Sequence, residues 1–179
     1  MTANPLSVVT AIRCSAPPAR VWNALVFFEE IERRPPLLLR LLLPTPLRTE
    51  GAHSGEGDET RCVYDRGHLV KRMTLVRPPH RYEFEVIEQA LEVGGAIRLI
   101  GGRYSLKELP GRSTRLWMET RYDGSNRPRT LSRPIEAAVC HAFHSHILRA
   151  IRRAAESAVK RKTSLPMRLG RSLFRVRRP

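Results

Sequence analysis

Residues 131–162 read LSRPIEAAVCHAFHSHILRAIRRAAESAVKRK. Ser132 followed by Pro134 is typical of a helix start, where a side-chain cap precedes a first-turn proline. An apolar stripe then recurs every 3.6 residues, at Ile135, Val139, Phe143, Ile147, Ala150 and Ala154. The stretch therefore predicts one long helix, and the rest of the chain has to cover its apolar side.

The region before this helix, from Thr49 to Gly124, has an apolar period of two with turn residues at regular intervals. One face is apolar or aromatic and the other charged, which is typical of an antiparallel sheet with one wet face. The pair Gly101 and Gly102 predicts a bulge or sharp bend. The strands that we expect are Glu59 to Arg66, His68 to Val76, Arg81 to Gln89, Ala96 to Leu109 and Arg112 to Gly124.

The N-terminal segment predicts a strand at Leu6 to Cys14, with Val8, Thr10 and Ile12 on one face. Two short helices should follow. The first carries Val21, Trp22, Leu25 and Phe28 at helical spacing, and the second, Phe28 to Arg34, stops at Pro35-Pro36. The fold class that we predict is α+β, with a curved antiparallel sheet of about seven strands wrapped around the C-terminal helix.

This order of elements resembles the SRPBCC superfamily, whose helix-grip fold is shared by START domains, polyketide cyclase/dehydrase-like proteins and Bet v 1-type binders. The stretch IRCSAPPARVWNAL, residues 12–25, is similar to the family's first strand and following helix. PPHRYEF, residues 78–84, is similar to its middle hairpin. The resemblance covers roughly residues 5–158. It implies a cavity between the sheet and the helix that holds an apolar ligand.

The composition is that of a folded protein, with 41% hydrophobic and 27% charged residues. The net charge of +15 is unusual, and its distribution is uneven. Residues 160–179 contain eight cations and no acid, which leaves +7 for residues 1–159. We therefore predict a ligand-binding domain over residues 1–159, followed by a basic, disordered tail over residues 160–179.

The tail mixes its cations with apolar residues, a combination that suits an anionic membrane surface. The segment Leu37 to Leu43 is too short to span a membrane but is able to contact one. Nucleic-acid binding through the same charge is an alternative, although no recognition element accompanies it. No secretion signal is seen at the N-terminus, so we expect a cytoplasmic or peripheral membrane protein. The sequence does not indicate the oligomeric state.

The inward strand faces and the helix supply aromatic and polar side chains for a ligand with one polar end. Simple packing of the core is the alternative for the same residues. The candidate ligand-binding residues are Tyr64, Phe84, Tyr104, Met118, Tyr122, Phe143 and His146.

The helix carries three histidines, His141, His144 and His146. The first two share a helix face and the third lies roughly opposite, so their spacing does not converge on a metal. Cys14, Cys62 and Cys140 are far apart, which indicates reduced thiols. No nucleotide-binding glycine motif is present either, so we expect neither a metal nor a cofactor.

Three functions fit these observations. The favoured one is binding or transport of a lipid, quinone or polyketide-like molecule. The second is a polyketide cyclase/dehydrase-like enzyme that uses His146 with Tyr104 or Tyr122 as its acid and base. The third is nucleic-acid association through the basic tail.

Overall fold

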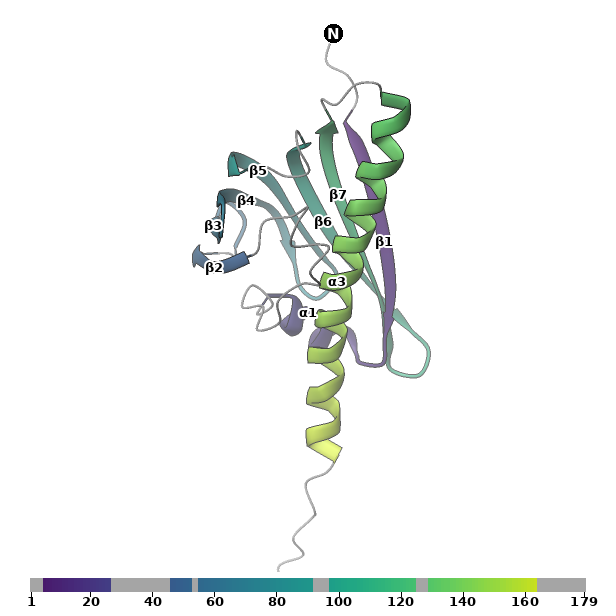
Figure 1. Ribbon diagram of the computed structural model, residues 1–179. Coiled ribbons are helices and arrows are strands. Elements are labelled where there is room, and N and C mark those ends of the chain that lie inside the picture. Colours follow the sequence, from purple (N-terminus) through teal and green to yellow (C-terminus); the bar gives the residue numbers. More distant parts are fainter. Residues whose placement is uncertain (1–4, 27–45, 53–54, 92–96, 125–128, 164–179) are drawn as a thin grey trace, which may run out of the picture.

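The computed structural model describes residues 5–26, 46–52, 55–91, 97–124 and 129–163. Its elements follow the predicted order (Figure 1). They are β1 (Leu6–Cys14), α1 (Pro18–Val26), β2 (Pro46–Gly51), β3 (Glu59–Tyr64), β4 (Gly67–Arg77), β5 (Arg81–Leu91), β6 (Ile97–Leu109), β7 (Ser113–Gly124) and α3 (Arg129–Thr163). The second short helix, expected at Phe28 to Arg34, lies outside the described residues.

The seven strands of the described residues form one antiparallel sheet in the order β1-β7-β6-β5-β4-β3-β2. The first and second strands are its two edges, so the sheet is curved but not closed. The predicted bulge is confirmed, because the register of β6 against β7 shifts between Leu99 and Gly101. The predicted α+β fold, with about seven strands and a long C-terminal helix, is therefore confirmed.

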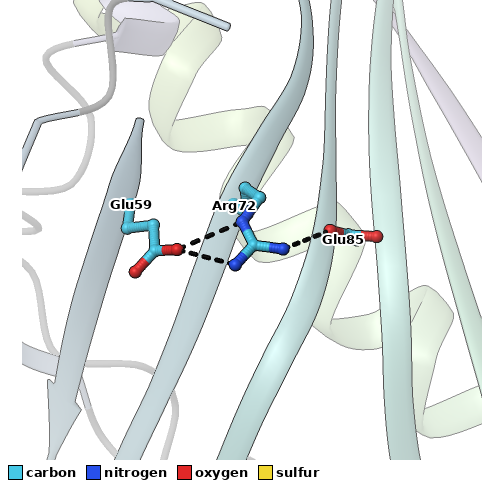
Figure 2. Close-up of polar contacts among 3 residues, drawn as sticks. All are labelled: Glu59, Arg72 and Glu85. Carbon is cyan, nitrogen blue, oxygen red and sulfur yellow. Dashed lines mark hydrogen bonds and ion pairs between the residues drawn. The ribbon is translucent and has the colours of Figure 1, made fainter. Parts of the chain in front are cut away.

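The two faces of the sheet differ in polarity, as the alternating pattern predicts. On β4, Leu69 and Met73 are buried on the inner face, whereas Arg72 is exposed on the outer face. Arg72 joins three strands there, because its guanidinium donates hydrogen bonds to Glu59 at 2.8 Å and to Glu85 at 3.3 Å (Figure 2). The outer face thus carries a cross-strand ion-pair network and the inner face carries the core.

Replacing Arg72 with Met should lower the melting temperature only slightly, because exposed ion pairs contribute little. The difference from wild type should disappear in 1 M NaCl, where the Debye length is about 3 Å. Thermal unfolding at low and high salt measures this effect. A large loss that persists in high salt would contradict the placement of Arg72 at the surface.

Helix α3 packs mainly on β1, β7 and α1. Figure 1 shows it running beside β1 and β7, at the end of the sheet opposite β2 and β3. Its rotation differs from the predicted stripe, because Ile135 is 65% exposed. Among the described side chains of α3, those of His144, Leu148 and Ile151 are fully buried, so the helix turns another side to the sheet. The prediction selected apolar residues by type and missed that a histidine lies at the centre of the buried side.

The described residues form two core clusters. The main cluster joins α1, the middle of the sheet and the C-terminal half of α3, and includes Trp22, Met73, Leu116 and Ile151. The smaller one, which we call the end cluster, contains Val8, Ile97 and Tyr122, with Leu6, Leu91, Leu99, Ala137 and Cys140 packed against it. All three cysteines are free, as the sequence indicates, with Cys14 and Cys62 buried.

Helix α3 ends at Thr163, four residues beyond the predicted end of the domain. The rest of the predicted tail, residues 164–179, and the segment Leu37 to Leu43 lie outside the described residues. In the part of the chain that the structure describes, no helix is long and apolar enough to cross a membrane.

Candidate functional site

Four aromatic rings meet on the inner face of the sheet, and we call them the aromatic cluster. Trp22 of α1 meets Tyr82 of β5 edge-on, with 6.2 Å between ring centroids. Tyr82 also lies 6.5 Å from Phe84 and 6.3 Å from Tyr104 of β6. Tyr82 and Trp22 are buried, whereas Phe84 and Tyr104 are half-buried. The cluster therefore has a buried base and two rings that remain partly accessible.

The register of β5 against β6 makes room for the Phe84 ring. Phe84 pairs with Gly102, and a Cβ atom at that glycine would lie 2.6 Å from Cζ of the ring. A side chain at position 102 would thus displace the ring. The second glycine of the predicted bulge therefore positions a predicted ligand-binding residue.

Lys71 places a cation on the same inner face. It lies between Leu69 and Met73 on the inward side of β4 and pairs with Val86. Its Nζ atom is 5.1 Å from the centroid of the Phe84 ring, a distance suited to a cation–π interaction. Lys71 is half-buried, and its cation beside partly accessible aromatic rings gives this apolar surface a strongly polar group.

The structure brings most of the predicted site residues to the inner face. Phe84, Tyr104, Met118 and Phe143 belong to the main core cluster or pack against it. Tyr122 instead lies in the end cluster, where burial is the main cause that raises the pKa of its hydroxyl. Tyr64 is half-buried at the end of β3. Whether these residues contact a ligand stays a prediction.

His146 is half-buried on α3, and the pKa of its imidazole is lowered by burial and then by Arg153 and Arg149. Its Nε2 atom is buried and has no hydrogen-bond partner among the described residues. It therefore makes no hydrogen bond through Nε2 to Tyr104 or to Tyr122. The acid–base pair of the cyclase hypothesis stays a prediction.

His144 is the histidine that connects α3 to the sheet. It is fully buried, with Nδ1 3.0 Å from Oγ1 of Thr10 on β1 and Nε2 2.8 Å from Oγ1 of Thr120 on β7. The Thr10 hydroxyl also lies 2.8 Å from Nδ1 of His141. Burial, and next the neighbouring His141, lower the pKa of His144 to about 4. This neutral imidazole therefore holds the helix on two strands.

The end cluster lies beside a buried acid, Glu136 of α3. Glu136 is 4% exposed, and its carboxylate approaches the backbone at Gly124, the last residue of β7. One helical turn further on, burial and then Glu136 raise the pKa of the Cys140 thiol to about 11. Glu136, Cys140 and Tyr122 thus form a group of protic side chains in apolar surroundings.

Among the described residues, no group of three or more His, Cys, Asp or Glu side chains is arranged to hold a metal ion. Lys71, Glu136 and His144 were not among the site residues expected from the sequence. Lys71 does leave a signal, because a lysine interrupts an apolar alternation at an inward position. Glu136 leaves no such signal in the sequence, since an acid in a helix with other charged residues is normally assigned to solvent.

Comparisons with known proteins agree with this architecture. No protein-family model matches the chain, and no curated protein sequence matches it. Among solved structures, TTHA0849 from Thermus thermophilus is 16% identical, with a TM-score of 0.59 over 86% of this chain and 99% of that one. The ZhuI aromatase/cyclase from Streptomyces sp. R1128 is 17% identical, with a TM-score of 0.59 over 87% and 96%.

A third similar structure is Ara h 8.0201, a Bet v 1-type allergen, at 13% identity and a TM-score of 0.52 over 86% of this chain and 99% of that one. Identities this low carry information on the fold alone. The chain has the helix-grip fold, as the sequence resemblance implied.

Proposed function

We propose that this protein binds an apolar small molecule between the inner face of the sheet and helix α3. The observation that carries the proposal is the aromatic cluster with Lys71. Phe84 and Tyr104 are only half-buried, and α3 packs mainly at the other end of the sheet, on β1 and β7. Small-molecule sites typically combine such an apolar, aromatic surface with few polar groups.

A fluorescent apolar probe tests the proposal directly. N-phenyl-1-naphthylamine should bind the full chain saturably, with a blue-shifted and enhanced emission. An excess of an unlabelled C12 compound should displace it from the same site. If the probe shows no saturable binding to the folded protein, the proposed function is wrong.

Replacing Phe84 with Ala should weaken binding of this probe about tenfold, because a partly accessible ring beside Lys71 is lost. The matched control is Trp117→Ala. Trp117 lies on the outer face, with its ring 5.5 Å from the Arg115 guanidinium. This control variant should bind the probe like wild type. Equal loss in both variants would show that the effect is general destabilisation, and circular dichroism checks the folding of each.

Docking at a membrane is a further part of the proposal and depends on residues 160–179 and Leu37 to Leu43. Cosedimentation with vesicles of phosphatidylserine and phosphatidylcholine tests it. The full chain should bind more tightly as the anionic lipid fraction rises, and a chain ending at residue 163 should lose most of this binding. Binding that is unaffected by the anionic lipid would contradict this part alone.

A further inference from the structure

Glu136 has a buried carboxylate that makes no hydrogen bond within the part of the chain that the structure describes. Its side chain is 4% exposed, and neither carboxylate oxygen has a partner there. Such groups are rare in native proteins, because a buried acceptor that makes no hydrogen bond carries the full cost of its lost hydration. The position of this carboxylate therefore calls for an explanation in terms of what it binds.

The backbone is shaped to admit this carboxylate. A Cβ atom at Gly124 would lie 2.6 Å from Oε2 of Glu136 and 3.1 Å from Oε1. Any other residue at the end of β7 would thus collide with the acid. The carboxylate therefore lies where a side chain at position 124 would force it to move.

Glu136 and Phe143 are seven residues apart on α3, so they share one side of the helix, about two turns or about 10 Å apart. Phe143 packs against the core cluster that contains the aromatic residues. A ligand lying beside Phe143 would reach Glu136 with an extended chain of roughly eight to ten atoms. At that end it would meet an acceptor among the apolar residues of the end cluster.

We propose that Glu136 is a subsite for the hydrogen-bond-donating end of the ligand, a hydroxyl or an amine. This inference rests on the proposed function and makes the ligand class more specific: an apolar chain or ring system that ends in a donor. A carboxyl C=O or carboxylate oxygen accepts hydrogen bonds, so a ligand end with an N–H or O–H pairs with it and an ether oxygen, which is itself an acceptor, does not.

Two probes with equal numbers of heavy atoms test this subsite. 1-Dodecanol and 1-methoxyundecane each displace N-phenyl-1-naphthylamine, but only the alcohol carries a donor. We expect the alcohol to compete about tenfold better with the wild-type protein, since it alone donates a hydrogen bond to a buried acceptor that otherwise has no partner among the described residues. In Glu136→Leu, the two probes should compete equally.

Each outcome has one meaning. Equal competition by both probes with wild type overturns the Glu136 subsite and leaves the proposed function standing. If neither probe competes and the fluorescent probe itself fails to bind, the proposed function is wrong and the subsite with it. The matched control is Glu88→Leu, which removes an exposed outer-face acid. It should retain the preference for the alcohol, and a lost preference there would contradict the assignment to Glu136.

Discussion

Lowering the pH from 7 to 4 should destabilise the protein by about 3 kcal/mol through His144 alone. The reason is the lowered pKa of this imidazole, about 4 instead of 6.5, which burial and then His141 cause. Between these two values the unfolded chain binds a proton at His144 and the native protein does not. The contribution of His144 to the free energy of unfolding is therefore fully present above about pH 6.5. It falls progressively as the pH is lowered towards 4, and the loss levels off below that value.

The fully buried position of His144 makes this effect large. Solvent does not screen a side chain that is 0% exposed, and its two ring nitrogens contact the hydroxyls of Thr10 and Thr120. Neither hydroxyl carries a charge that would favour an imidazolium. Protonation therefore acts against the attachment of α3 to β1 and β7.

Denaturant unfolding at several pH values between 4 and 7 measures this prediction. Other groups titrate in the same range, so the informative quantity is the difference between wild type and His144→Gln. The variant should be less stable at pH 7 but lose less stability on acidification. The control His80→Gln removes an exposed histidine and should follow wild type. If the free energy of unfolding depended on pH in the same way in wild type and in His144→Gln, the pH dependence could not be assigned to His144.

The strands could be predicted closely because their signal is local. The segment Leu6–Cys14 was predicted to the residue, and the sheet's inner face contains Val8, Thr10 and Ile12 as expected. An alternating pattern with one wet face fixes the register strongly, since a slip of one residue would bury the charges of the outer face. Because a sheet of this size must bury its apolar face, the long C-terminal helix was the element expected to cover it.

The polar residues between the sheet and α3 were harder to predict. Lys71 and Glu136 are of types that a sequence pattern assigns to solvent, and His144 is of a type with no strong preference. Each of them is buried or half-buried next to a residue of another element. Lys71 lies over the Phe84 ring, Glu136 lies against Gly124, and His144 contacts two threonines. Such long-range partners leave no periodic signal in one sequence.

The same limitation explains the rotation of α3. Its apolar residues are spread around the helix, so several stripes fit the spacing equally well, and the choice among them depends on the sheet. On the buried side, the hydroxyls of Thr10 and Thr120 contact His144, which lies next to the buried Leu148 and Ile151. The predicted stripe contains Phe143 and Ile147, which do reach the core, but also the exposed Ile135.

A pair of identical substitutions on α3 tests this rotation. Replacing Ile151, which is 0% exposed, with Ala should lower the free energy of unfolding by about 2–5 kcal/mol, because buried methyl groups are lost and a cavity remains. Replacing Ile135, which is 65% exposed, with Ala should change it by less than about 0.5 kcal/mol, and the higher helix propensity of Ala favours a small gain.

Denaturant midpoints of the two variants, compared at a common slope, measure both free energies. The substitution is chemically the same and the helix is the same, so propensity and residue type cancel and only the side of the helix differs. A large loss at Ile135 with a small one at Ile151 would mean that the predicted stripe faces the sheet. His144 would then leave its two threonines, and its pH dependence would disappear with them, so the two measurements check one another.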